Sequence, residues 1–197
     1  EVVALDMSPA MLAAGRALSA PSGAAIQWQE GNAMALPFAP GRFDLALCQH
    51  GLQFFPDRPV AVREMRRVLS PGGRACAIVL QHLDRHPVFQ ALMTSVARHL
   101  SLPLNAVATP FALSDASELR GIFKDAGFGQ VRTHLESTVV RFPDPARFIP
   151  MAVASSAAAV PAFSQMEKPE QAALLDNVRA ETRAVIEQFV DGNFVTF

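Results

Sequence analysis

Short apolar runs alternate with helical patterns through residues 1–80. Runs that are apolar on both faces are typical of buried strands in a parallel sheet. Strands are predicted at residues 2–5, 25–28, 43–48 and 74–80, and the run at 43–48 is mostly apolar on both faces. Strands that alternate with helices form βαβ units with right-handed crossovers. The pattern therefore predicts an α/β fold with a mostly parallel sheet, whose ligand site lies at the edge where the loops after the strands gather.

A serine and an aspartate stand where helix caps are expected. Ser8 precedes Pro9, which suits the first position of a helix, and Asp57 can cap a second helix. Proline and glycine at residues 70–73 are expected to end that second helix. Its predicted apolar stripe consists of Val62, Met65 and Leu69. Its other face, expected to be solvated, carries Arg63, Glu64, Arg66 and Arg67.

The rest of the chain predicts helices with fewer strands. Helices are expected at residues 87–100, at 115–126 before Gly127, and at 144–159. A long strand is predicted at residues 131–142, and another opens at 193–197. The last helix follows Pro161, and its predicted stripe is Leu175, Val178, Thr182, Val185 and Phe189. No repeat or linker divides the chain. We therefore expect one domain over residues 1–197, with residues 143–190 as a helical insertion before the last strand.

Composition narrows the possible partners. Half of the 197 residues are hydrophobic and 18% are charged, which favours a folded chain over a disordered one. The net charge of -1 gives no overall basic field for a nucleic-acid backbone. No apolar run reaches the roughly 18–20 residues that a membrane-spanning helix needs. We expect a soluble protein with neither a nucleic-acid nor a membrane partner, and no pattern indicates an oligomeric state.

Two cysteines, Cys48 and Cys76, stand alone in apolar runs. Two thiols cannot form a disulfide framework, and neither they nor the histidines have a metal-ligand spacing. The cysteine pattern favours a reducing cytoplasm, and no metal site is predicted.

Four stretches of sequence, taken in order, resemble a known family. They are residues 3–12 (VALDMSPAML), 31–38 (GNAMALPF), 43–47 (FDLAL) and 63–73 (REMRRVLSPGG). Together they resemble the class I S-adenosylmethionine-dependent methyltransferases, in the small-molecule group that includes ubiquinone and menaquinone methyltransferases. The resemblance implies a Rossmann-like three-layer sandwich, S-adenosylmethionine as the cofactor, and a small, partly apolar molecule as the methyl acceptor.

The resemblance assigns the nucleoside part of the cofactor to two strand ends. Asp6 stands where the family's acidic residue accepts hydrogen bonds from both ribose hydroxyls, and Met7 stands where an apolar side chain packs on adenine. Asn32, beside Ala33, replaces an acid that binds the adenine amino group. An asparagine oxygen can still accept that hydrogen bond, without the charge. Both positions also suit ordinary turns, in which aspartate and asparagine bind nearby backbone N–H groups.

The run after the third strand is implied to face the methionine part of the cofactor and the acceptor. Gln49 and His50 are expected nearest the transferred methyl group, with Gln53 and Phe54 on the acceptor side. His50 is a weak candidate for a general base, because imidazole titrates near neutral pH. A histidine at a strand end also serves as an ordinary structural residue.

Within residues 143–190, the resemblance implies a lid over the acceptor. Phe148 and Met151 are the substrate-binding candidates there, and plain core packing is the alternative.

The chain departs from the family in its glycine-rich loop. That loop, which follows the family's first strand and cradles the methionine end of the cofactor, is absent from these residues. We therefore expect a fragment that lacks the first strand and part of the last, with impaired or no activity. Two alternatives stay open. A partner-binding module without catalysis would suit Asn32, and a nicotinamide-dependent reductase would use an acid at a strand end. The chain has no Tyr, which removes the Tyr-Lys pair common in short-chain reductases.

Overall fold

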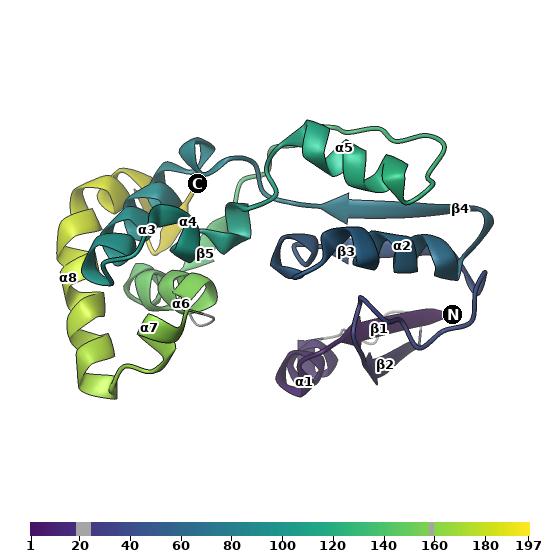
Figure 1. Ribbon diagram of the computed structural model, residues 1–197. Coiled ribbons are helices and arrows are strands. Elements are labelled where there is room, and N and C mark those ends of the chain that lie inside the picture. Colours follow the sequence, from purple (N-terminus) through teal and green to yellow (C-terminus); the bar gives the residue numbers. More distant parts are fainter. Residues whose placement is uncertain (19–24, 158–159) are drawn as a thin grey trace. The chain divides into compact units, whose positions relative to one another are not determined.

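The computed structural model describes residues 1–18, 25–157 and 160–197 (Figure 1). The end of the helix predicted at 144–159 lies outside the described residues. The chain divides into two compact units. The first unit comprises residues 1–78 and 116–132, and the second comprises residues 79–115 and 133–197. The single domain with a helical insertion stays a prediction.

The first unit begins with a parallel strand pair. β1 (Val2–Asp6) pairs with β2 (Ile26–Glu30), and α1 (Pro9–Leu18) lies between them in the sequence. The predicted cap is confirmed, because Ser8 Oγ accepts the amide N–H of Met11 at 3.3 Å. Gly15 allows α1 to approach β2 closely, since a Cβ there would lie 2.5 Å from the Trp28 ring.

A second parallel pair joins β3 (Phe43–Gln49) to β4 (Leu69–Ile78). Between them come the 3₁₀ helix η1 (Leu52–Phe54) and α2 (Arg58–Val68). The Asp57 cap is confirmed, because its carboxylate accepts the Val60 N–H at 2.9 Å. α2 buries one stripe of side chains: Ala61, Val62, Met65 and Val68.

The predicted start of β4, at residue 74, is wrong. β4 begins at Leu69, directly after α2, because residues 70–73 form a bulge within the strand and not a separate turn. Phe43 pairs with Leu69, and Leu45 already pairs with Arg74. A bulge absorbs extra residues by bending one strand, and Gly72 adopts the positive φ of 81° that the bend requires.

α5 (Ala116–Asp125) completes the first unit and contacts α2. Its predicted end at Gly127 is confirmed: the Gly127 N–H binds the Lys124 carbonyl at 2.9 Å, and the Phe128 N–H binds the Phe123 carbonyl at 3.2 Å. This bond pair with a positive φ at glycine is a Schellman motif.

The long strand predicted at residues 131–142 is mostly wrong. Only β5 (Arg141–Pro143) forms, and residues 131–140 have no regular structure. Alternating apolar residues suit a strand, but a strand also needs a neighbour for its backbone N–H and C=O groups. Residues 131–139 have no strand neighbour among the described residues, and Leu135 and Val139 are exposed.

The second unit is helical, with one small sheet. Its helices are α3 (Pro87–His99), α4 (Leu104–Val107), α6 (Pro145–Ala157), α7 (Pro161–Ser164) and α8 (Lys168–Ile186). Short 3₁₀ helices are η2 (Leu83–Arg85), η3 (Thr109–Phe111) and η4 (Glu187–Phe189). In the antiparallel sheet, β7 (Phe194–Thr196) lies between β5 and β6 (Val190–Asp191), which confirms the strand predicted near the end of the chain.

The core of the second unit lies among α3, α6 and α8. Fully buried members include Leu92, Val153 and Val178. The predicted stripe of α8 is correct at Val178 and Thr182, whereas Leu175 and Val185 are each one position away from a buried residue. Phe189 lies beyond α8, in η4, and is partly buried. The buried residues recur every four positions, because this face of the helix packs against α3 and α6: Leu174, Val178, Thr182 and Ile186.

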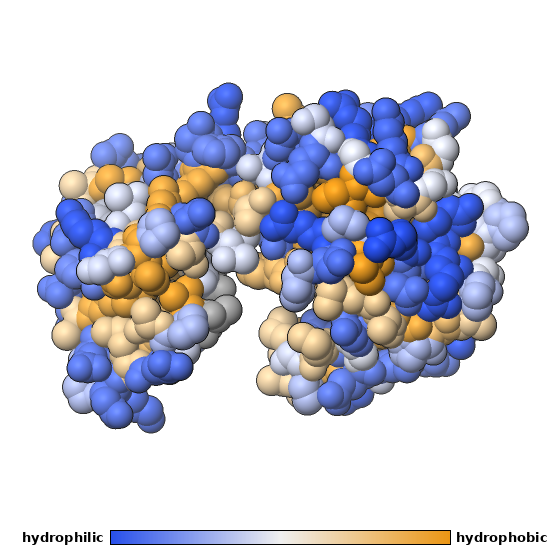
Figure 2. Space-filling model, in the orientation of Figure 1, coloured by the Kyte–Doolittle hydropathy of each residue, from blue (hydrophilic) through white to orange (hydrophobic). Residues whose placement is uncertain are grey.

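The fold is α/β with parallel strand pairing, as predicted. The parallel strands form two separate pairs among the described residues, so β1 and β3 each have a neighbour on one side only. Hydrophobic residues reach the surface in both units (Figure 2), and Met7 and Leu47 are among the large side chains most exposed. No described helix has the length and apolarity that crossing a membrane requires.

Candidate functional site

Asp6 lies at the carboxyl end of β1 and is partly buried. Its Oδ1 accepts the amide N–H of Ser8 at 2.8 Å, so the turn contact expected of an aspartate is present. This contact orients the carboxylate at the strand end and leaves lone pairs for further donors, since a carboxylate offers about four acceptor sites. Met7, the next residue, is 71% exposed.

The loop after β2 lies against this strand end. The Gly31 N–H donates to the Asp6 carbonyl oxygen at 3.0 Å, and a Cβ at Gly31 would stand 2.7 Å from a methyl group of Leu5. Asn32 follows at once in the chain. The structure therefore brings two predicted cofactor segments together, Asp6–Met7 and Asn32–Ala33, at the ends of neighbouring parallel strands.

Asn32 begins a tight turn. Its Oδ1 accepts the Met34 N–H at 2.9 Å, and its carbonyl accepts the Ala35 N–H at 3.0 Å. The side-chain oxygen thus has a local partner, as in an ordinary Asx turn. The contacts fix the backbone of Ala33 within a closed turn beside the end of β1.

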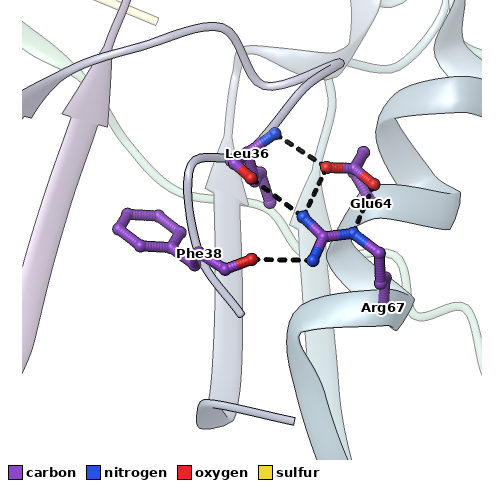
Figure 3. Close-up of polar contacts among 4 residues, drawn as sticks. All are labelled: Leu36, Phe38, Glu64 and Arg67. Atoms are coloured by element: carbon purple, nitrogen blue, oxygen red, sulfur yellow. Dashed lines mark hydrogen bonds and ion pairs between the residues drawn. The ribbon is translucent and has the colours of Figure 1, made fainter. Parts of the chain in front are cut away.

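An ion pair on α2 holds the segment that follows this turn (Figure 3). Glu64 Oε2 accepts the Leu36 N–H at 2.7 Å, while the Arg67 guanidinium donates to the carbonyls of Leu36 at 2.8 Å and Phe38 at 2.7 Å. The two side chains also bind each other, with Arg67 Nε 2.6 Å from Glu64 Oε1. The hydrogen bond from Arg67 is the main reason that the pKa of Glu64 lies below its ordinary value.

These contacts correct the expectation of a fully solvated face. Glu64 and Arg67 are 19% and 33% exposed at their side chains, and both bind the chain backbone. Arg66 lies 5.9 Å from the Phe128 ring, whereas Arg63 is exposed. A Glu and an Arg three residues apart on a helix also form ordinary surface pairs, so the sequence alone carried no signal for this role.

His50 follows β3 in a strained backbone conformation. Its φ of 51° lies in the left-handed region, which is uncommon for residues other than glycine. Its N–H donates to the Ile78 carbonyl at 2.8 Å, and its side chain is exposed. Gln49 pairs with Ile78 and is exposed as well. Backbone strain of this kind is often found at functional sites.

Cys48 supports the turn at His50. The backbone N–H groups of Gly51 and Leu52 bind its sulfur, and a Cβ at Gly51 would lie 3.1 Å from that sulfur. Burial raises the pKa of the Cys48 thiol, and these hydrogen bonds offset the shift only in part. Cys48 is therefore a protonated packing residue at neutral pH and not an activated nucleophile.

Cysteine labelling is expected to separate the two thiols. At pH 8, iodoacetamide should modify exposed Cys76 about tenfold faster than Cys48, because alkylation needs an accessible thiolate. Mass spectrometry of tryptic peptides over time measures both rates, and Cys76→Ser isolates the slow one. Equal rates in the folded chain would contradict the partly buried position of Cys48.

The acceptor-side candidates lie in different surroundings. Gln53 is 2% exposed and its Oε1 has no hydrogen-bond partner among the described residues, whereas neighbouring Phe54 is exposed. Phe148 is buried in the second unit against Phe89 and Phe142. Met151, on the same helix, is half exposed. Their role in substrate binding stays a prediction, and for Phe148 the structure supports core packing.

Other polar clusters have a structural role. Glu181 of α8 accepts hydrogen bonds from Ser95 and Arg98 of α3 and contacts His99, which ties the two helices together. The Ser95 hydroxyl is the main cause of the lowered pKa of Glu181. Across residues 1–18, 25–157 and 160–197, no three His, Cys, Asp or Glu side chains are grouped so that they could hold a metal ion.

Comparison with known proteins identifies the family of the first part of the chain. Residues 1–77, which contain β1 to β3, the 36–38 segment and most of β4, match the methyltransferase domain family. This part of the chain is a methyltransferase domain. Its fold agrees, because the YcgJ protein of Bacillus subtilis superimposes with a TM-score of 0.53 at 17% identity, covering 100% of this chain and 77% of that one. A Bacillus halodurans C-125 protein described as a methyltransferase gives a TM-score of 0.52 at 19% identity, covering 100% and 78%.

Relatives of this chain include enzymes named for quinones. The 2-phytyl-1,4-naphtoquinone methyltransferase of Synechococcus elongatus is 39% identical over 95 residues, 47% of this chain and 39% of the relative. The enzyme of the same name from Thermosynechococcus vestitus is 43% identical over 147 residues, 66% and 62%. The demethylmenaquinone methyltransferase of Lactococcus lactis is 41% identical over 144 residues, 65% and 56%. The chain thus spans less than two thirds of each of these relatives.

Proposed function

We propose that this chain contributes to methyl transfer from S-adenosylmethionine to a small, partly apolar acceptor, and that residues around Asp6 hold the nucleoside part of the cofactor. One observation carries the proposal. The carboxylate of Asp6 and the closed turn at Asn32 and Ala33 lie side by side, joined by the bond from Gly31 to the Asp6 carbonyl. The ends of neighbouring parallel strands are where α/β sheets bind nucleotides.

The side chains and backbone groups at this site fit an adenosine group. Asp6 would accept hydrogen bonds from the two ribose hydroxyls, a contact that an ionised oxygen makes well. Exposed Met7 offers a polarisable, apolar side chain to one adenine face. Ala33 would donate its backbone N–H to a ring nitrogen, and Asn32 would bind the exocyclic amino group.

Methyl transfer requires little covalent chemistry from the protein. The cofactor supplies an activated methyl group on a sulfonium. An acceptor atom would take this methyl group from the sulfur, and any proton that the acceptor must lose would go to a base. The chain's share is to orient both molecules and exclude water. Gln49 and the strained turn at His50 would line this region, with His50 as the candidate proton acceptor.

A quinone-type ring in its reduced form is our proposed acceptor. The support comes from the relatives, several of which are named for naphthoquinone or menaquinone substrates. The chain offers exposed Phe54 close in sequence to His50, and an aromatic side chain suits stacking on such a ring. No observation on the described residues favours the partner-binding module or the nicotinamide reductase.

We further propose that these 197 residues alone transfer methyl groups slowly. The described strand-to-helix turns, such as residues 7–8 after β1, include no glycine-rich loop for the methionine end of the cofactor. The nucleoside part can bind without that loop, but the reactive methyl group would be poorly placed. Misplacement by about 1 Å can cost about a hundredfold in rate.

Two measurements test the proposed function directly. Equilibrium dialysis should show that the chain binds labelled S-adenosylmethionine, that S-adenosylhomocysteine displaces it, and that NADPH at the same concentration does not. Label transfer to a reduced demethylated menaquinone analogue should be detectable and slow. Tighter binding of NADPH than of S-adenosylmethionine would overturn the proposal in favour of a reductase.

A further inference from the structure

We propose that Glu64 and Arg67 are positioning residues for the cofactor, acting through the backbone of residues 32–38. The proposal rests on the function proposed above and adds a part of the site that no candidate residue covered. Neither side chain is assigned a contact with the cofactor. They would set the place of the Asn32–Ala33 turn, and with it the adenine contacts.

The pair binds three backbone groups in a stretch of three residues (Figure 3). Both the N–H and the C=O of Leu36 bind the pair, and the C=O of Phe38 binds Arg67. A loop outside a sheet has no strand neighbour for such groups, so side chains must satisfy them where they are buried. Here the side chains of Glu64 and Arg67 make the hydrogen bonds that a neighbouring strand would otherwise make.

The anchor itself is firmly held. α2 is capped by Asp57 and buries Val62 and Met65, so its last turn is a rigid base for the ion pair. The Arg67 main chain makes a further hydrogen bond to this segment, because its carbonyl accepts the Gly41 N–H at 3.0 Å. The segment from 36 to 41 is thus fixed to α2 at both ends.

The turn at Asn32 lies between two fixed points. On one side Gly31 binds the Asp6 carbonyl, and on the other side Leu36 binds Glu64 and Arg67. The turn is closed internally by the bonds from Met34 and Ala35. Its position relative to Asp6 therefore depends on the ion pair, which holds Leu36, four residues after Asn32 in the chain. Loss of that pair would leave the turn intact and free its downstream end.

Arginine is needed for this geometry. Its guanidinium donates to Leu36 and Phe38 through different nitrogens while Nε binds Glu64. Lysine has a single ammonium group and cannot hold this planar arrangement, although it keeps the positive charge. Arg67→Lys therefore distinguishes a requirement for geometry from a requirement for charge.

The test uses the full chain with S-adenosylhomocysteine as probe, and Arg63→Met as the matched control on the same helix. We expect Arg67→Met to raise the dissociation constant about tenfold, since hydrogen bonds to charged groups are lost. Arg67→Lys should approach that loss, and Arg63→Met should bind like wild type. In amide spectra of the ligand-free chain, Arg67→Met should shift residues 32–41, while β3 and β4 keep their wild-type positions.

The outcomes separate this inference from the proposed function. If the wild type does not bind the probe, the proposed function fails. If the wild type binds and folded Arg67→Met binds equally well, the positioning role is overturned. Should Arg67→Met fail to fold, Glu64→Gln keeps the side-chain shape and removes the charge. Weaker binding by folded Glu64→Gln would support the role, and unchanged binding would overturn it.

Discussion

Asp6→Asn is expected to weaken S-adenosylmethionine binding about a hundredfold. Each hydrogen bond to a charged acceptor is worth about 1.5–3 kcal/mol, and the proposed contact has two such bonds to ribose hydroxyls. Asparagine keeps one acceptor oxygen and replaces the other by an NH₂ donor. One ribose hydroxyl therefore loses its acceptor, and the other keeps an acceptor that is no longer charged. Competition calorimetry against S-adenosylhomocysteine would measure the change.

The stability of the turn after β1 is the structural control for Asp6→Asn. The Asn side chain can still accept the Ser8 N–H that Asp6 Oδ1 accepts, so the turn after β1 should persist. The urea midpoint of Asp6→Asn is therefore expected to stay close to that of wild type, whereas Asp6→Ala should lower it. If Asp6→Asn binds the cofactor within about threefold of wild type, Asp6 has only its turn role.

Leu92→Ala is expected to destabilise the second unit by about 2–5 kcal/mol. Leu92 is fully buried on α3, in the core that α3 forms with α6 and α8, and the change leaves a cavity. Cofactor binding at Asp6 should persist under conditions where the first unit stays folded, because the proposed nucleoside site lies within that unit. Urea unfolding followed by hydrogen exchange of each unit would measure both effects.

Leu135→Ala is the matched control. Leu135 is 79% exposed, so its truncation should change the free energy of unfolding by less than about 0.5 kcal/mol. An equal effect of the two substitutions would contradict the core assignment. Loss of cofactor binding by Leu92→Ala, with the first unit still protected from exchange, would show that the nucleoside site needs the second unit.

Local signals in the sequence were sufficient for most of the first unit. Caps at Ser8 and Asp57 and the glycine stop at Gly127 act through contacts a few residues away, so their residue types predict them. Long-range pairing was harder to predict. The strand expected at 131–142 was mostly wrong, because alternation of apolar residues does not tell whether a neighbouring strand exists. The start of β4 was predicted too late, because the sequence of its bulge resembles that of a turn.

The candidate site shows the same division. Asp6 and Asn32 were predicted because the stretches that contain them resemble the family, and parallel strand pairing places both near one edge. Glu64 and Arg67 were read as a solvated face, because their contacts with Leu36 and Phe38 join segments about thirty residues apart. Only the folded chain reveals which members of a charged helix face meet a loop.

The proposed nucleoside site lies at the ends of β1 and β2. Titration of the ¹⁵N-labelled chain with adenosine, followed by amide NMR, tests it most directly, because NMR detects weak binding and adenosine needs no contact with the methionine end. If the site binds a nucleoside, saturable shifts are expected at Asp6, Met7, Gly31, Asn32 and Ala33, and Asp6→Asn should abolish them. Absence of shifts at millimolar adenosine, or shifts that spare these five residues, would contradict it.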